Sequence, residues 1–318
     1  MIDMHMHTTY SDGADSLIEV LKKAESLKLE YISITDHDTC EGYKELAKLD
    51  VKKYFSGQII NGVEIKCAYK KRLIEILGYK VDPKVINNFM EEFHKTKSKE
   101  ILQQKYFDIL HERCKDMGLV MSKKEDIEFN PKTDWASIKI YNDIKAHEEN
   151  KLKVPDDFWS EFNIFSKKYC GDVNYPLYID KSEDYLQLDE AIKLVKDAGG
   201  LVFLPHIFIY KWAENKKKLL DDIVAEYDVD GIECMHSEFS QDDIDYLLNY
   251  TQKNHFYRSG GSDYHGKNKV GIEMAVGKGN LKIESYLIQD WVNKWLVWHM
   301  LDKSINCTCI KKEKIINI

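Results

Sequence analysis

The sequence predicts an α/β fold built on a mostly parallel sheet, either open or closed into a barrel. Two observations support this prediction. Short apolar segments alternate with segments of helical periodicity at both ends of the 318-residue chain, and strands that alternate with helices form parallel sheets. The stretch between these ends has no strand rhythm, which indicates a helical insertion within the α/β domain.

The first elements follow in order from the N-terminus. Residues 2 to 6 are expected to form a short strand, and Asp15 or Ser16 to cap a helix. The apolar positions of this helix recur at helical spacing; they are Leu17, Val20, Leu21 and Ala24. YISIT predicts a buried strand that ends at Asp36, and GQIINGVEIKCAYKKRLIEILGYKV predicts a hairpin that turns near residues 70 to 72.

The middle and last parts of the chain differ in pattern. Residues 83 to 182 are expected to form a mostly helical insertion, so residues 1 to 82 and 183 to 318 make one discontinuous domain. In the last part, helices are expected at 190–198, 216–225 and 242–253, and strands at LVFLP, DGIECM and HFYRS. LIQDWVNKWLVWHML is expected to be a packed C-terminal helix, because it is too short and too polar to span a bilayer.

Composition excludes several classes of protein. The net charge of −8 argues against general binding of duplex nucleic acid or acidic lipid. Seven cysteines without a CxxC pair indicate buried thiols and a reducing compartment, the cytoplasm, instead of a disulfide framework. The N-terminal residues lack a basic segment followed by a long apolar run, so no signal peptide is expected.

Residues that bind metals follow several of the predicted strands. His5 and His7 are one residue apart, so both rings project from one face of a strand, and Asp12 follows in a turn. Thr35, Asp36, His37 and Asp38 follow YISI directly. Each motif alone has an ordinary explanation, such as surface histidines or a helix cap, although a cap leaves His37 unexplained.

Further polar residues follow in the same manner. Glu64 and Glu75 lie in the two arms of the hairpin, and a carboxylate can bridge two ions. His206 follows LVFLP, and Asp263 and His265 lie in GGSDYHG; His236 ends GIECM and is the least certain ligand among them. Ligands in parallel α/β folds bind beyond the carboxyl ends of strands, so these clusters predict one shared site.

These motifs, in this order, resemble the PHP (polymerase and histidinol phosphatase) family. The matching segments are D-M-H-M-H-T-T-Y-S-D-G at residues 3–13, T-D-H-D at 35–38, G-V-E at 62–64, P-H at 205–206 and G-G-S-D-Y-H-G at 260–266. The resemblance covers nearly the whole chain. It implies a distorted (β/α)7 barrel with two or three divalent ions at the carboxyl rim of its strands.

The resemblance also implies the ligands of these ions. The matching positions are His5, His7, Asp12, His37, Glu64, His206, Asp263 and His265. Glu75 stands where many members have histidine before I-L-G-Y, so it is either an oxygen ligand or no ligand. Mixed imidazole and carboxylate ligands suit Mn²⁺, Fe²⁺ or Zn²⁺ better than Mg²⁺ or Ca²⁺.

The resemblance implies a phosphoesterase in which a metal-bound hydroxide attacks phosphorus. Asp36 and Asp38 are expected to orient ligand histidines, and His206 or His236 to protonate the leaving group if neither binds an ion. The branch with an insertion after the hairpin is similar to phosphatases of nucleoside 3',5'-bisphosphates and of RNA 5' ends. A phosphomonoester or phosphodiester of a nucleotide or short oligonucleotide is therefore the expected substrate, with the insertion as a lid that selects it.

Other interpretations stay open at this point. The same residues could serve a metal-dependent amidohydrolase, although no lysine stands at a matching strand end to bridge the ions. A small-molecule phosphatase such as histidinol phosphate phosphatase is disfavoured by the insertion. A non-catalytic metal-binding module is a third alternative. Four lysines of the insertion either cover the pocket or form a solvated helix face; they are Lys95, Lys97, Lys99 and Lys105.

Overall fold

The computed structural model describes residues 1–292 and divides the chain into two compact units. The first, which we call the barrel unit, comprises Met1–Lys66, Ile74–Asn87 and the described residues from Asp189 to Val292. The second, the helical unit, comprises Cys67–Leu73 and Asn88–Leu188. Each unit has a hydrophobic core of its own.

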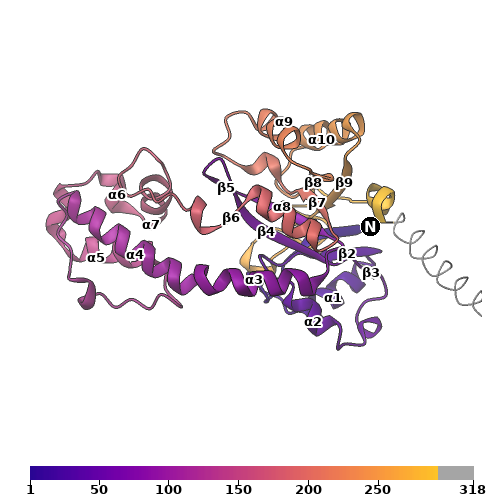
Figure 1. Ribbon diagram of the computed structural model, residues 1–318, viewed down its shortest axis with the longest axis horizontal. Helices are drawn as coiled ribbons and strands as arrows, with labels where there is room; N and C mark the ends of the chain where they lie inside the picture. Colours follow the sequence, from indigo (N-terminus) through magenta and orange to yellow (C-terminus); the bar gives the residue numbers. More distant parts are fainter. Residues whose placement is uncertain (293–318) are drawn as a thin grey trace, which may run out of the picture. The chain divides into compact units, whose positions relative to one another are not determined.

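In the described residues of the barrel unit, strand pairing and single bridges connect seven strands into a distorted ring; these strands are labelled in Figure 1. Strands β1 and β2 pair in parallel, as do β7 with β8 and β8 with β9, whereas β5 runs antiparallel to β7. Single bridges, Met6 with Tyr264 and His37 with Glu64, join the two sheets. The ring strands are β1 (Ile2–Met6), β2 (Tyr31–Ile34), β4 (Gly62–Tyr69), β5 (Arg72–Tyr79), β7 (Leu201–Leu204), β8 (Gly231–His236) and β9 (Tyr257–Gly261).

The ring strands belong to a three-stranded sheet, in the order β1-β2-β3, and a six-stranded sheet, in the order β6-β4-β5-β7-β8-β9. The additional strands β3 (Gln58–Ile59) and β6 (Leu186–Gln187) have two residues each. The hairpin β4–β5 turns at Lys70 and Lys71, close to the predicted turn. The predicted α/β fold of the PHP type, a distorted barrel with a helical part, is confirmed.

The predicted helices of the barrel unit begin and end close to the expected residues, and a short helix at Glu41–Leu46 was not predicted. Ser16, not Asp15, caps α1: its hydroxyl accepts a hydrogen bond from the backbone N–H of Glu19, whose carboxylate accepts one from Ser16 N. The predicted apolar face of α1 is buried. The helices are α1 (Leu17–Ser26), α2 (Glu41–Leu46), α8 (Leu188–Asp197), α9 (Lys216–Glu226) and α10 (Gln241–Asn254).

Close backbone approach brings β9 against β1. A Cβ atom on Gly261 would lie 2.4 Å from the Cβ atom of His5 and 2.5 Å from its backbone nitrogen. Only glycine fits at this position, because any side chain would overlap β1. Gly261 therefore allows the end of β9 to reach the strand that carries His5.

Aromatic side chains pack together in the hydrophobic core of the barrel unit. Tyr79 packs edge-on against Phe203 and stacks on Trp291, with ring centroids 4.9 and 5.3 Å apart. Trp291 belongs to the predicted C-terminal helix, whose residues 293–301 lie outside the described residues. Among residues 1–292, no helix combines the length and the apolar character needed to cross a bilayer. The five cysteines of this range are free thiols.

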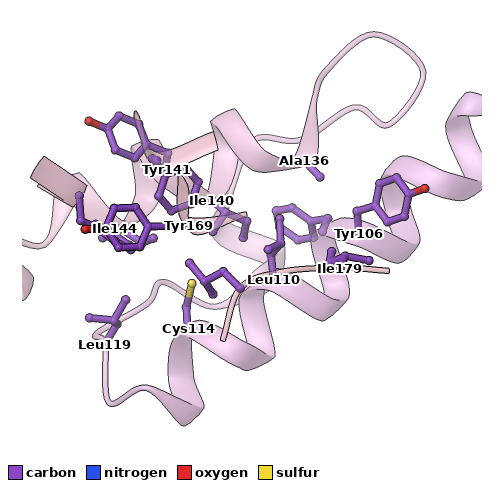
Figure 2. Packing of buried hydrophobic residues seen from close by; sticks show 14 residues of the cluster. Tyr106, Leu110, Cys114, Leu119, Ala136, Ile140, Tyr141, Ile144, Tyr169 and Ile179 are labelled. Atoms are coloured by element: carbon purple, nitrogen blue, oxygen red, sulfur yellow. The ribbon is translucent and has the colours of Figure 1, made fainter. Parts of the chain in front are cut away.

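The helical unit is organised around two helices, α4 and α5 (Figure 2). Tyr106, Leu110 and Cys114 on α4 are buried, as are Ile140 and Ile144 on α5. Figure 2 shows these side chains gathered between the helices together with Tyr169 and Ile179. The helices that contribute residues to this unit are α3 (Pro83–Lys97), α4 (Lys99–Asp116), α5 (Ala136–Ala146), α6 (Asp156–Ser160) and α7 (Phe162–Ile164).

Candidate metal centre

The predicted site residues lie mostly at the carboxyl ends of parallel strands. His5 is on β1 and His7 follows this strand, while His37 follows β2. His206 follows β7, and Asp263 follows β9. Parallel strands of a barrel end at the same rim, so these side chains meet there. The local sequences therefore bring together residues that are more than 200 positions apart.

Glu64 lies among four imidazoles. It is 1% exposed and stands near the start of β4, opposite the end of β2. Its Oε2 atom lies 3.1 Å from His5 Nε2 and 3.2 Å from His7 Nε2. Oε2 is also 3.3 Å from His37 Nδ1, and Oε1 is 2.8 Å from His206 Nε2. The two oxygens thus address different histidines, as a carboxylate shared by two ions requires.

Asp263 and Asp12 complete the cluster. Asp263 Oδ1 lies 3.4 Å from His7 Nε2 and 3.4 Å from His265 Nδ1. Asp12 Oδ1 lies 3.1 Å from His265 Nε2, and its Oδ2 atom 3.7 Å from His37 Nε2. The side chain of Asp12 is 58% exposed, in contrast to the buried Asp263. The cluster is therefore accessible to solvent on the side of Asp12.

The nitrogen and oxygen atoms form three contiguous groups of metal-binding type. Within each group, one donor atom per residue lies within 4.8 Å of the others. His7, His37 and Glu64 each belong to two groups. The groups are His5 with His7 and Glu64; His7 with Asp12, His37 and His265; and His37 with Glu64 and Glu75. The structure thus brings together all nine residues proposed as ligands, since His206 and Asp263 contact these groups directly.

Buried nitrogen atoms without hydrogen bonds show that these residues fit divalent ions. Neither ring nitrogen of His7 has a hydrogen-bond partner among the described residues, although Nε2 lies close to Glu64. His37 Nδ1 and His206 Nδ1 are in the same situation. A buried nitrogen normally has a partner, and an ion provides one. The mixture of imidazole and carboxylate suits first-row divalent metals.

The buried carboxylates raise the pKa values of the histidines His5 and His7 that they contact. Burial lowers the pKa of the His7 imidazole, but the carboxylates of Asp263 and Glu64 outweigh it and raise this pKa to about 9. Burial also opposes protonation of His5, whose pKa nevertheless lies well above its ordinary value because Glu64, Glu233 and Asp263 surround it. An ion that binds these nitrogens must therefore displace protons.

The carboxylates show the opposite shift. Burial raises the pKa of Glu64, but the imidazoles around it lower it well below the ordinary value. The pKa of Asp263 likewise lies well below its usual value: burial raises it, but His5 and His236 lower it more. Burial also works against ionisation of Asp12, yet His265 and His37 lower its pKa to about 2. All three carboxylates are thus anionic at neutral pH.

Glu233 on β8 was not predicted. Its Oε1 atom lies 2.9 Å from His5 Nδ1, and Oε2 accepts a hydrogen bond of 2.8 Å from the backbone N–H of His206. Glu233 is fully buried in the apolar strand GIECMH. One charged residue in such a strand needs a charged or polar partner, and this was the signal that could have revealed it. Glu233 thus orients His5 through Nδ1 without belonging to a donor group itself.

His236, at the end of β8, is close to Asp263 but belongs to none of the three groups. Its Nδ1 atom accepts a hydrogen bond of 3.1 Å from Glu238 N, so Nε2 carries the proton of the neutral ring. Nε2 lies 3.2 Å from Asp263 Oδ2. Lys269 contacts the same oxygen. Both partners hold Asp263 with its other oxygen toward the histidines.

Asp36 and Asp38 have other partners than the expected histidines. Asp36 accepts hydrogen bonds from the backbone and hydroxyl of Thr8, both 2.7 Å, and from Ser11. Asp36 thereby fixes the turn after His7. Asp38 accepts a hydrogen bond of 3.0 Å from Lys66 N, and its burial raises its pKa to about 7. These hydrogen bonds of both aspartates thus reach backbone and hydroxyl groups of neighbouring segments.

Backbone geometry also marks this rim. Asp38, His206 and Asp263 have φ values of 54°, 29° and 57°, in the left-handed region that non-glycine residues rarely adopt. Such conformations persist where the surrounding contacts fix them, and they are frequent at functional sites. Asp3 provides such contacts: it accepts hydrogen bonds from the backbone and hydroxyl of Ser262, directly before Asp263.

The lysines of the helical unit have partners within that unit. Lys105 Nζ lies 2.5 Å from the buried Asp184, which Lys97 also approaches. Lys95 pairs with Glu92, and Lys99 lies over the ring of Trp135. These contacts are compatible with a solvated helix face.

Comparisons with known proteins place this geometry in a family. The PHP domain model matches residues 3–258. The chain is 25% identical over 276 residues to the phosphoribosyl 1,2-cyclic phosphate 1,2-diphosphodiesterase of Eggerthella lenta, covering 83% of this chain and 94% of the relative. It is 23% identical over 277 residues to the 3',5'-nucleoside bisphosphate phosphatase of Chromobacterium violaceum, covering 86% and 90%. The 5'-3' exoribonuclease Rnm of Escherichia coli is 24% identical over 267 residues, covering 83% and 84%.

Solved structures share the fold. A protein from Bifidobacterium adolescentis, assigned as a metal-dependent phosphoesterase, has a TM-score of 0.59 at 20% identity and covers 91% of this chain and 94% of its own. A protein from Chromobacterium violaceum described as an amidohydrolase, with bound sulfate, has a TM-score of 0.56 at 20% identity and covers 84% of this chain and 88% of its own. The chain therefore belongs to the PHP domain family of metal-dependent phosphoesterases, as its motifs predicted.

Proposed function

We propose that this protein hydrolyses a phosphate ester of a nucleotide, either a nucleoside 3',5'-bisphosphate or the 5' end of a short oligonucleotide. The observation that carries the proposal is the position of Glu64, whose buried carboxylate lies within 3.3 Å of four imidazoles. Such an arrangement destabilises the fold, because it buries many polar groups, unless these groups have binding partners. Two adjacent cations would be such partners.

Eight residues would hold the ions. Bound ions lower the pKa of water toward neutrality and compensate the charge on phosphoryl oxygens. The residues of this chain hold and orient: imidazoles supply neutral nitrogen ligands, and the anionic carboxylates supply oxygens. The eight are His5, His7, Asp12, His37, Glu64, His206, Asp263 and His265.

His236 and Glu233 would act through the residues that they contact. His236 donates its Nε2 proton to Asp263, and its Nδ1 atom already accepts a hydrogen bond. It therefore has no proton left for a leaving group, and we assign it to positioning Asp263. Glu233 holds His5 with Nε2 toward Glu64, which is the orientation that a ligand requires.

The names of the relatives favour the substrate class. A phosphoribosyl cyclic phosphate, a nucleoside bisphosphate and RNA all carry a phosphate ester on ribose. The proposed helical insertion at residues 83–182 would contribute to the choice among them. Five free cysteines among the described residues support a reducing compartment, and we propose the cytoplasm.

A substrate screen tests this proposal. The Mn²⁺-loaded protein is incubated with nucleoside 3',5'-bisphosphates, 5'-phosphorylated oligonucleotides, small phosphomonoesters and amides, and released phosphate, nucleotide or amine is measured. We expect hydrolysis of the first two classes. The variants H37A and D263A should lose this activity while keeping the circular dichroism spectrum of the wild type.

His94→Ala is the matched control, because His94 is an exposed histidine of the helical unit and belongs to none of the donor groups. It should keep full activity. Full activity in H37A and D263A would contradict the assignment of the site. Hydrolysis of amides with intact phosphoesters would instead support an amidohydrolase.

A further inference from the structure

Lys66 reaches into the metal centre beside Glu75. Its Nζ atom lies 3.2 Å from Glu75 Oε1, while Glu75 Oε2 lies 3.6 Å from His206 Nε2. Glu75 thus faces an ammonium group with one oxygen and the cluster with the other. Glu75 is also the one motif position at which this chain departs from the histidine of many family members.

The hairpin fixes this pair. Strands β4 and β5 are joined by two residues, Lys70 and Lys71, with φ values of 47° and 64°. Such two-residue connections set the register, and residues equally distant from the turn face each other across the strands. Lys66 and Glu75 are each three residues from the strand ends at the turn. Their side chains therefore leave the same face of the hairpin together.

Hydrogen bonds hold both backbones in place. The N–H of Lys66 donates to the buried carboxylate of Asp38 at 3.0 Å. The N–H of Glu75 donates to the hydroxyl of Tyr210 at 2.9 Å. The pair is thus a fixed part of the rim, with the side chains of Lys66 and Glu75 37% and 17% exposed. It differs in this respect from an ion pair between two mobile surface side chains.

The charge of Lys66 affects whether Glu75 can bind an ion. Glu75 belongs with His37 and Glu64 to one of the three donor groups, so it would be a ligand of an ion bound there. A divalent cation at that position would lie close to the ammonium group of Lys66, and like charges repel strongly where water is partly excluded. The ammonium already compensates the charge of Glu75. Lys66 and a third cation are therefore alternatives.

We propose that Lys66 takes the place of a third metal ion, so that the protein binds two ions and keeps a fixed ammonium group beside Glu75. This proposal rests on the proposed metal centre and specifies its composition. Histidine at position 75 would offer a neutral nitrogen to a third ion, whereas glutamate there needs a cation for charge balance, and Lys66 supplies it without depending on metal supply.

The number of metal ions bound per chain tests this proposal directly. The purified wild type and variants are saturated with Mn²⁺, freed of excess ion, and analysed for manganese per chain by mass spectrometry. We expect two ions in the wild type. Lys66→Gln removes the ammonium at nearly constant length and should bind three. The double variant Lys66→Gln with Glu75→Gln should return to two, because the third ion then lacks its carboxylate.

Two controls accompany these variants. Lys66→Arg keeps the cation and should bind two ions. Lys44→Gln breaks an exposed lysine–glutamate pair, Lys44 with Glu41 at 2.6 Å, neither of which belongs to a donor group, and should also bind two. Thermal unfolding reports whether each variant is folded, and the count for the wild type tests the proposal even if a variant is not.

The outcomes separate this proposal from the proposed function. Three ions in the wild type, or two in folded Lys66→Gln, would overturn the exchange of an ion for Lys66. Two ions in a wild type that hydrolyses none of the nucleotide substrates would support the role of Lys66 and contradict the proposed substrate. A wild type that binds no ion would contradict both.

Discussion

The rim of the barrel unit and the core of the helical unit bury very different side chains. At the rim, His5, Glu64 and Glu233 are at most 1% exposed although all three can carry charge. In the helical unit, the side chains of Phe158 and Phe165 are buried to the same degree and pack on each other with ring centroids 5.1 Å apart. Both regions are interior, but apolar burial stabilises a fold and burial of charge opposes it.

This contrast separates residues that are kept for stability from residues that are kept for chemistry. The aromatic core of the helical unit is explained by packing alone. The rim is not, because a protein gains no stability from gathering histidines and carboxylates that could be replaced by apolar side chains. Changes at the rim should therefore affect ion binding and catalysis, and changes in the helical core should affect the free energy of unfolding.

The largest effect is expected for Glu64→Gln. The substitution keeps the shape of the side chain but removes the charge that lies among four imidazoles. We expect hydrolysis of a nucleoside 3',5'-bisphosphate to fall by roughly 10³-fold or more, since charge neutralisation at such a centre contributes several kcal/mol. The folded structure should remain, and near-wild-type kcat in this variant would show that the rim is not the active site.

The reverse pattern is expected for Phe165→Ala in the helical unit. Phe165 is fully buried and contacts Tyr141, Phe158 and Phe162. Loss of this ring should lower the free energy of unfolding by about 3–5 kcal/mol, as measured by urea denaturation. Manganese content and activity per folded molecule should stay unchanged at a temperature where the variant is folded. Loss of bound manganese from the folded variant would mean that the two regions are not independent.

A smaller effect on ion binding is expected for Glu233→Gln. Glu233 accepts hydrogen bonds from His5 and from the backbone of His206, but it belongs to none of the donor groups. Partners of this type typically contribute 10–100-fold to metal affinity. Competition with a chelating dye should show a loss of about that size. An unchanged affinity would show that Glu233 does not contribute to ion binding through His5.

Ion affinity is also expected to change gradually with pH. The pKa of His7 is about 9, so below this value an ion must displace its proton. The Mn²⁺ affinity of the chelator-stripped protein should therefore rise as pH increases from 6.5 toward 9, by up to about tenfold per pH unit for each displaced proton. Calorimetric titration in buffers of different ionisation enthalpy would count these protons. An affinity independent of pH in this range would contradict the role of His7 as a ligand.

Most of the fold followed from local patterns in the sequence. The apolar spacing of Leu17 to Ala24 and the capping signal at Ser16 gave α1, and short apolar runs before glycine or histidine gave β7, β8 and β9. Most of the ligand candidates were found because they directly follow a predicted strand in the sequence, whereas Glu64 and Glu75 lie within the hairpin strands. The closure of the ring was supplied by the family resemblance, since single bridges such as His37 with Glu64 leave no local signal.

The partners of the candidate ligands could not be found in the same way. Glu233 contacts His5 from a strand more than 220 residues away, and no periodicity reveals such a pair. Lys66 and Glu75 are a different case, because the predicted hairpin turn fixes their register and could have placed them opposite each other. Asp36 and Asp38 were expected to orient ligand histidines, and their hydrogen bonds reach Thr8 and the backbone N–H of Lys66.

Removal and return of the metal ions tests the account most directly. The protein is stripped with a chelator, and hydrolysis of a nucleoside 3',5'-bisphosphate is followed while Mn²⁺ is added back in measured amounts. The account predicts no hydrolysis in the stripped protein and recovery that saturates at two ions per chain. Undiminished hydrolysis by the stripped protein, with no ion bound, would contradict it.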